Sequence, residues 1–163
     1  MSISKQIDGL FEEQALDLEH YFPHYLSTIS NRWMSTSSRL YLSRFGIGIV
    51  EWRVLGMLGS LDQSGSSTSL EIAKALSIDP GAVSRAMRNL VAKGMVEPLQ
   101  GKFLGNTKPF TMTSNGRDLF RQVRAVALER EALLLQDLND GERSQLIALL
   151  QKVFNRLDDL GEK

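Results

Sequence analysis

The chain has 163 residues, of which 42% are hydrophobic and 23% charged, and its formal net charge is zero; these values fit one folded domain with a core and exclude a disordered or fibrous chain. No apolar run is long enough for a membrane span, and the absence of cysteine excludes disulfides, thiolate zinc sites and thiol redox switches. Two histidines, and no phosphate-loop or metalloprotease motif, lead us to expect no enzyme, no metal and no cofactor.

The N-terminal third predicts an acidic extension followed by two helices. Residues 1–20 carry five acidic side chains against one lysine and have no apolar segment, so we expect no secretory signal and a cytoplasmic protein. Apolar residues at helical spacing after Pro23 predict a helix over about residues 22–44, which ends at Gly46 and Gly48. A second helix is predicted over about residues 49–60, followed by a polar loop that extends to Ser67.

Two helices with clear end signals follow, over residues 69–76 and about 80–93. Thr68 and Glu71 have the spacing of a capping box at the start of the first helix. Asp79 and Pro80 are typical of the start of the second helix, and Gly94 suits the left-handed residue after its end. The predicted buried faces are Leu70, Ile72, Ala73 and Leu76 in the first helix, and Val83, Met87, Leu90 and Val91 in the second.

A β-hairpin and two long helices complete the chain. Residues 95–99 and 110–113 predict two short strands joined by an exposed tip over residues 100–108. Residues 113–116 offer a cap for a helix that extends to about 137, with Leu119, Val123, Val126 and Leu133 on its apolar face, and residues 139–142 cap the last helix. In that last helix a coiled-coil-like seam is predicted, made of Leu146, Leu150, Val153, Leu157 and Leu160 and widened by Leu149 and Phe154.

This order of elements predicts a mainly α fold with a small β-hairpin wing, in which a winged helix-turn-helix is flanked by N- and C-terminal dimerisation helices. The terminal helices exceed what a small central module needs, so we favour contacts between two subunits over packing within one chain. The expected parts are an N-terminal extension (1–21), an N-terminal dimerisation helix (22–48), the winged helix-turn-helix (49–113) and the C-terminal dimerisation helices (114–163).

The helix over residues 80–93 has a small and cationic outer face, which suits double-stranded DNA. Residues 80–108 hold five basic side chains against one acid, although the whole chain is neutral. Arg85 and Arg88 are the candidates for base reading, because a guanidinium can bind guanine or a phosphate pair. The other candidate DNA contacts are Thr68 at a helix start, Gly81, Ala82, Ser84 and Asn89 on the outer face, and Lys102 and Lys108 on the hairpin tip.

Several motifs together resemble those of one known family. The run from Leu70 to Leu76, continued by Val83-Ser84-Arg85 and by residues 90–96, is similar to a two-helix signature that ends at Lys/Arg-Gly before a wing strand. Residues 112–116 are similar to a Leu-Thr-x-x-Gly motif after the wing, and residues 51–55 resemble the preceding helix. These are motifs of the MarR family of bacterial transcription regulators, and the resemblance covers about residues 22–160. Residues 105–108 depart from the family's Asp-x-Arg wing pattern, with Lys108 in place of the arginine.

The resemblance implies a homodimer that binds pseudo-palindromic promoter DNA, as a repressor, and releases it when a small aromatic or phenolic effector binds between the dimerisation and DNA-binding parts. The sequence offers a lining for such a pocket in His24, Tyr25, Arg32, Trp33 and Trp52, although an aromatic stripe at helical spacing is also typical of ordinary core. The alternative is a winged-helix module that binds protein and has no sequence-specific DNA binding; that role favours an apolar or acidic outer face, which Arg85 and Arg88 oppose.

Overall fold

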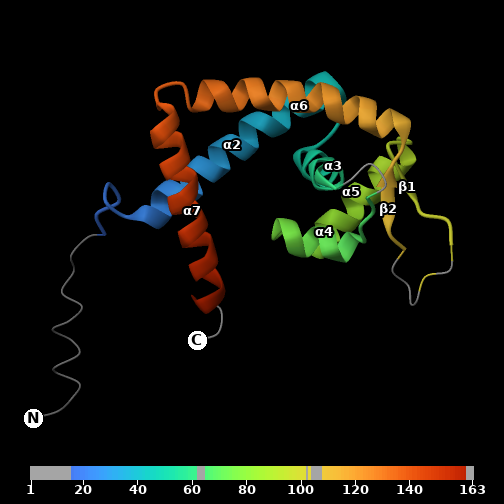
Figure 1. Ribbon diagram of the computed structural model, residues 1–163, viewed down its shortest axis with the longest axis horizontal. Coiled ribbons are helices and arrows are strands. Elements are labelled where there is room, and N and C mark those ends of the chain that lie inside the picture. Colours follow the sequence, from blue (N-terminus) through green and yellow to red (C-terminus); the bar gives the residue numbers. More distant parts are fainter. Residues whose placement is uncertain (1–15, 62–64, 102, 104–107, 161–163) are drawn as a thin grey trace, which may run out of the picture. The chain divides into compact units, whose positions relative to one another are not determined.

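The computed structural model describes residues 16–61, 65–101, 103 and 108–160. Figure 1 shows the helices and the small two-stranded sheet, and the predicted fold class, mainly α with a β-hairpin, is confirmed. In chain order the elements are α2 (Phe22–Phe45), α3 (Ile49–Ser60), α4 (Ser69–Leu76), α5 (Pro80–Ala92), β1 (Val96–Pro98), β2 (Phe110–Met112), α6 (Ser114–Leu134) and α7 (Asp140–Leu160).

The chain divides into two compact units, one that ends at Ile49 and one that begins at Val50. The first unit contains α2, which has Pro23 in its first turn. The helix ends at Gly46, whose φ of 67° is left-handed and lets its N–H bond to the carbonyl of Leu42. Tyr41 is buried, whereas several apolar side chains of α2 are exposed: Phe22, Tyr25, Leu26, Ile29 and Leu42.

The core of the second unit lies where α3, α4, α5 and α6 meet. Its buried apolar side chains come from each helix and from both strands: Val54, Leu55, Leu58, Ile72, Ala73, Val83, Ala86, Met87, Leu90, Val96, Met112, Val123 and Val126. Helical spacing predicted most of these, because residues three and four apart share one face of a helix.

Three residues from the predicted apolar faces are exposed. Leu70 is 62% exposed because it stands two positions before Ile72, on the opposite side of a helix of only eight residues. Val91 is exposed because Ala86 completes the α5 stripe in its place, and Leu133 is exposed near the end of α6. The predictions for Leu70 and Val91 were wrong because an apolar residue need not lie on the side of the helix that the core covers, whereas Leu133 lies on the same face of α6 as Val126.

The predicted capping box at the start of α4 is confirmed. The Thr68 hydroxyl accepts from the N–H of Glu71 at 3.2 Å, and Glu71 Oε2 accepts from the N–H of Thr68 at 2.8 Å. The same carboxylate oxygen also accepts from the hydroxyls of Thr68 and Ser67. These hydrogen bonds, the one from the Thr68 N–H first, hold the pKa of Glu71 below its ordinary value.

The other predicted caps are also present. The Asp79 carboxylate accepts from the N–H of Ala82 at 2.8 Å and begins α5. Asn139 and Glu142 exchange side-chain and backbone hydrogen bonds, as a capping box does, at the start of α7. Each helix start therefore lies where the sequence predicted it.

Strand β2 of the wing is paired on both of its edges. Strands β1 and β2 pair antiparallel, with Val96 opposite Met112. On the other side of β2, Phe110 and Ser67 exchange two backbone hydrogen bonds, of 2.9 and 3.1 Å. The segment that precedes α4 is therefore paired with the wing, so that α4 and β2 are tied through backbone.

The junction between the wing and α6 explains the motif at residues 112–116. The Thr113 hydroxyl accepts from the N–H of Gly116 and donates to the carbonyl of Gly94 at 2.7 Å. Gly116 lies directly against the backbone carbonyl oxygen of Met95, so closely that a Cβ at position 116 would overlap it. The threonine thus caps α6 and holds the end of α5, while the glycine permits the close approach.

We predict that Gly116→Ala destabilises the protein by about 2–3 kcal/mol, because backbone must shift to admit the methyl group. Urea unfolding measures this. Gly56→Ala is the matched control, because position 56 in α3 has open space and a helical alanine stabilises by up to about 1 kcal/mol. Equal stability of the two variants would contradict the proposed contact.

Candidate nucleic-acid interface

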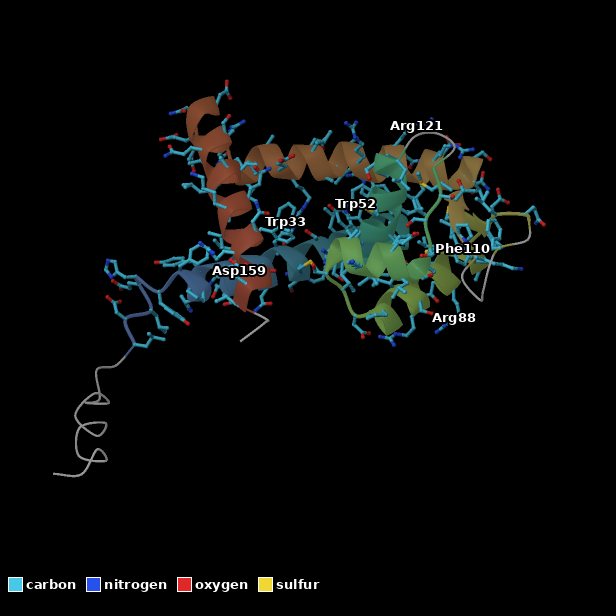
Figure 2. All side chains as sticks on the ribbon, turned by 60° about the horizontal axis from the view of Figure 1, so that its bottom comes forward. Trp33, Trp52, Arg88, Phe110, Arg121 and Asp159 are labelled. Atoms are coloured by element: carbon cyan, nitrogen blue, oxygen red, sulfur yellow. The ribbon has the colours of Figure 1, made fainter. Side chains whose placement is uncertain are left out.

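The outward face of α5 is small and cationic. Val83, Ala86, Met87 and Leu90 are buried against the core, whereas Gly81, Arg85, Arg88, Asn89 and Ala92 are exposed and Ala82 and Ser84 are partly exposed. Figure 2 shows Arg88 at the edge of the second unit, on the side away from Arg121. The residues that the sequence assigned to base reading thus share one accessible helix face.

The two arginines of this face have small residues one turn before them, Gly81 and Ser84. Arg88 Nη1 donates to the hydroxyl of Ser84 at 3.1 Å, which directs the guanidinium along the helix. The guanidinium of Arg85 lies over the start of the helix, where its Nη1 would be in ordinary contact, 3.4 Å, with a Cβ at position 81. The Asp79 carboxylate bounds the same space more closely, at 3.1 Å from that Cβ. The hydroxyl of Ser84 therefore orients Arg88, and Arg85 lies beside the cap of the helix.

The end of α5 is anchored by a buried ion pair. Lys93 Nζ lies 2.9 and 3.1 Å from the two carboxylate oxygens of Glu51 on α3, and the Glu51 side chain is only 7% exposed. Two residues further along α3, Arg53 donates to the carbonyl of Leu76 at the end of α4 at 2.8 Å. Helix α3 therefore holds the C-terminal ends of both helices of the helix-turn-helix.

Sequence reasoning missed this ion pair. Lys93 was counted with the basic excess of residues 80–108, but its charge is balanced by Glu51. A signal was present in the sequence, because Glu51 falls at helical spacing with Val54, Leu55 and Leu58, which are core residues. An acidic side chain on such a face requires a partner.

The remaining candidate DNA contacts lie outside α5. Thr68 is the N-cap of α4 and its hydroxyl is engaged with Glu71, whose carboxylate brings a negative charge to this helix end. Lys108 is exposed just before β2. Lys102 lies outside the described residues, as do residues 104–107 of the wing tip.

The five candidate ligand-binding residues are divided between the two units. His24, Tyr25, Arg32 and Trp33 all belong to α2, where the rings of His24 and Tyr25 meet edge to face at 5.8 Å between centroids. Trp52 belongs to α3, and its ring stacks on that of Phe120 from α6, with centroids 5.7 Å apart. Phe120 is a neighbour that sequence reasoning did not identify, because no local pattern links positions 52 and 120.

Two kinds of feature are absent from the residues that the structure describes. Among those residues no helix is long and apolar enough to cross a membrane. Within the same ranges no group of three or more metal-ligating side chains lies together.

A short capped helix, a turn, a second helix with an exposed cationic face and a two-stranded wing define a winged helix-turn-helix protein. The family model described as "MarR family" matches residues 45–101. The HTH-type transcriptional repressor Rv2887 of Mycobacterium tuberculosis is 30% identical over 112 residues, which cover 69% of this chain and 78% of that protein. The chain belongs to the MarR family of transcriptional regulators, as its motifs predicted.

Solved structures agree with this assignment. A MarR/EmrR family transcriptional regulator from Acinetobacter sp. ADP1 has a TM-score of 0.80 and 29% identity, covering 88% of this chain and 99% of that one. MepR from Staphylococcus aureus in complex with DNA has a TM-score of 0.72 and 27% identity, over 85% and 98%. A mutant MarR from Escherichia coli complexed with operator DNA has a TM-score of 0.70 and 27% identity, over 86% and 99%.

We predict that Lys93→Met destabilises the protein by on the order of 2 kcal/mol, because it removes the ammonium group that pairs with the buried Glu51 carboxylate. The loss is smaller than for a fully buried pair, since the lysine side chain is 39% exposed. The double variant Glu51→Gln, Lys93→Met recovers much of the loss. Urea unfolding of the four proteins in a double-mutant cycle gives the coupling, and a coupling near zero would contradict the assigned pair.

Proposed function

We propose that the protein is a homodimeric repressor that binds pseudo-palindromic promoter DNA and releases it when a small effector binds. The observation that carries this proposal is the exposed face of α5, where two arginines stand beside small residues on a helix with both ends fixed. A helix of this kind enters the major groove without bulky side chains that hold it away. The relatives support the same interpretation, since they include a repressor and two regulators in complex with DNA.

The proposed DNA contacts divide by role. Arg85, Arg88 and Asn89 read base edges, with Ser84 as the hydroxyl that orients Arg88. Gly81 and Ala82 allow the start of α5 to approach the bases. Lys102 and Lys108 contact phosphate from the wing, and Thr68 fixes the start of α4 at the DNA surface. The segment 49–113 is accordingly the proposed DNA-binding domain.

The proposed homodimer rests on apolar surface left uncovered in each unit. On α7, none of the described side chains is buried. The predicted seam is partly exposed at Val153 and exposed at its other positions, Leu146, Leu149, Leu150, Phe154, Leu157 and Leu160. The residues that line a groove of about 630 Å³ between α6 and α7 include Leu128, Leu135 and Ile147. The turn between these two helices is held by Arg143, which donates to the carbonyls of Leu135 and Leu138. Exposed apolar patches of this kind mark interaction sites. Segments 22–48 and 114–163 are the proposed dimerisation parts.

The proposed effector is a small aromatic or phenolic molecule. His24, Tyr25, Arg32 and Trp33 on α2 and Trp52 on α3 offer aromatic faces and one guanidinium for it. This part of the proposal rests on the chemistry of these residues and on the family resemblance.

We predict that Arg85→Ala and Arg88→Ala each weaken binding to the cognate promoter site by about 1–3 kcal/mol, with a much smaller loss on random DNA. The reason is that a lost base contact removes sequence information, whereas a lost phosphate contact does not. Lys108→Ala weakens cognate and random DNA alike and reduces the salt slope by about one unit. Fluorescence anisotropy at three salt concentrations, on duplexes from the gene's own upstream region and on scrambled duplexes, measures these effects.

Arg124→Ala is the matched control for this experiment, because Arg124 is an exposed arginine on α6 and not on α5. Equal losses of affinity for cognate and random DNA would show that Arg85 and Arg88 contact phosphates and do not read bases. Absence of any preference for upstream fragments in the unmodified protein would favour the protein-interaction alternative.

We predict that Leu157→Asp converts the homodimer into single chains, because it places a charge in the apolar seam. Sedimentation equilibrium at micromolar concentration measures the mass, and circular dichroism checks that the helices remain. Asn155→Asp is the control, since position 155 is exposed on the opposite side of α7. A mass of one chain for the unmodified protein would exclude the homodimer.

A further inference from the structure

Three consecutive residues of α3 contact three different elements of the second unit. Glu51 pairs with Lys93 at the end of α5, where the ammonium nitrogen lies 2.9 and 3.1 Å from the two carboxylate oxygens. Trp52 stacks on Phe120 of α6, and Arg53 donates to the carbonyl of the last residue of α4. Figure 1 and Figure 2 both show α3 between α6 and the pair formed by α4 and α5. Less than one turn of α3 therefore connects the helix-turn-helix to α6.

The two charged residues of this run hold opposite ends of α5. Glu51 holds the C-terminal end through Lys93. Arg53 holds the N-terminal end, because the Leu76 carbonyl that it binds lies one short turn before Pro80, the first residue of α5. A helix of 13 residues is about 20 Å long, so a shift of about 2 Å at one end tilts its axis by about 6°. The direction of α5 is therefore set from α3.

The turn between α4 and α5 depends on the same support. Ser77, which follows Leu76, has a φ of 50°, and among the described residues it is the one non-glycine residue with a positive φ. A left-handed serine persists only where its surroundings hold it. The N–H groups of Ser77 and Ile78 bond to carbonyls of α4, and Arg53 holds the carbonyl directly before them.

Trp52 connects α3 to α6. Its ring stacks on that of Phe120 at 5.7 Å between centroids and 25° between planes. The same Phe120 ring lies against Gly59 of α3, so closely that a Cβ at position 59 would overlap it. The contact of Gly116 with the Met95 carbonyl also joins α5 to α6, but only at the end of α5, so it leaves the tilt of α5 undetermined. The contacts of α3 therefore decide how α5 lies relative to α6.

We propose that Glu51, Trp52 and Arg53 are positioning residues that fix the spacing between the two halves of the DNA site that the protein accepts. This inference rests on the proposed function, because it requires a homodimer on a pseudo-palindromic site, with α6 among the dimerisation parts. In a two-fold dimer any tilt of one α5 is repeated in its partner, so the separation of the two helices changes twice over. Each base pair adds about 3.4 Å and about 35° between the half-sites, so their spacing is recognised as geometry.

The test measures how strongly DNA affinity depends on half-site spacing. The duplexes carry the upstream site that footprinting identifies, either unchanged or with one base pair inserted or removed at its centre. A further duplex has one half-site scrambled. The unmodified protein is expected to lose roughly tenfold in affinity for either change of spacing, because the two copies of α5 no longer fit both half-sites. Fluorescence anisotropy measures this without added small molecules, since Trp52 is also a proposed effector contact.

Three variants remove the contacts of α3 and leave the outward face of α5 unchanged: Glu51→Gln with Lys93→Met, Arg53→Met, and Phe120→Leu. Each is expected to bind the unchanged site more weakly, and its penalty for altered spacing is expected to fall to about threefold or less. Affinity for the duplex with one scrambled half-site is expected to stay within about twofold, because one α5 still reads one half-site. Arg53→Lys keeps a donor and is expected to recover most of the spacing preference.

Asp159→Asn is the matched control. It removes an ion pair with Arg156 that lies within α7 and joins no two elements, so the full spacing penalty is expected to remain. Thermal unfolding confirms that each variant is folded, and sedimentation equilibrium confirms that each has the mass of the unmodified protein.

The outcomes separate the inference from the proposed function. Variants of the α3 contacts that keep the full spacing penalty would overturn the inference. Equal losses on the complete site and on the duplex with one scrambled half-site would also overturn it, because the damage would then lie in the outward face of α5. If the unmodified protein binds no upstream duplex, or binds it regardless of spacing, the proposed function itself fails.

Discussion

The second unit depends on one backbone atom, the carbonyl oxygen of Met95. It accepts from the N–H of Thr113, and it lies against Gly116 with no side chain between them. The N–H of the same residue bonds to the carbonyl of Leu90 and so closes the end of α5. The end of α5, the base of the wing and the start of α6 therefore meet at Met95. A shift of any of these elements moves the others.

This junction explains why local signals predicted so much of the fold. Helix starts were predicted from Thr68, Asp79 and Asn139, because the hydrogen bonds of a cap involve residues only two or three positions apart. The left-handed Gly94 after α5 was likewise visible in the sequence. The small outer face of α5 followed from helical spacing. In each case the interaction that fixes the structure lies within one turn of the residue that signals it.

What the sequence did not reveal depends on distance along the chain. The Glu51–Lys93 pair joins residues 42 positions apart, and Trp52 meets Phe120 across a longer separation still. No periodicity links such distant positions. In the sequence, Glu51 and Lys93 are therefore indistinguishable from surface charges, and the rings of Trp52 and Phe120 from ordinary core residues. The predictions that Leu70 and Val91 are buried were wrong for a related reason, because an apolar residue in the sequence does not show where the next element packs. The sequence therefore predicted the exposed residues of the candidate site, but it did not predict the ion pair between Glu51 and Lys93 that supports them.

The capping box of α4 has a consequence for acid conditions. This helix has eight residues, too few to persist alone, and its N-terminus depends on one carboxylate, that of Glu71. Because the pKa of Glu71 is lowered in the folded protein, its contribution to stability is complete above the ordinary pKa of a glutamate and is lost as the pH falls through the lowered value. Protonation of Glu71 removes the negative charge that accepts hydrogen bonds from both Thr68 and Ser67. In acid, fraying is therefore expected at the start of the first helix of the helix-turn-helix.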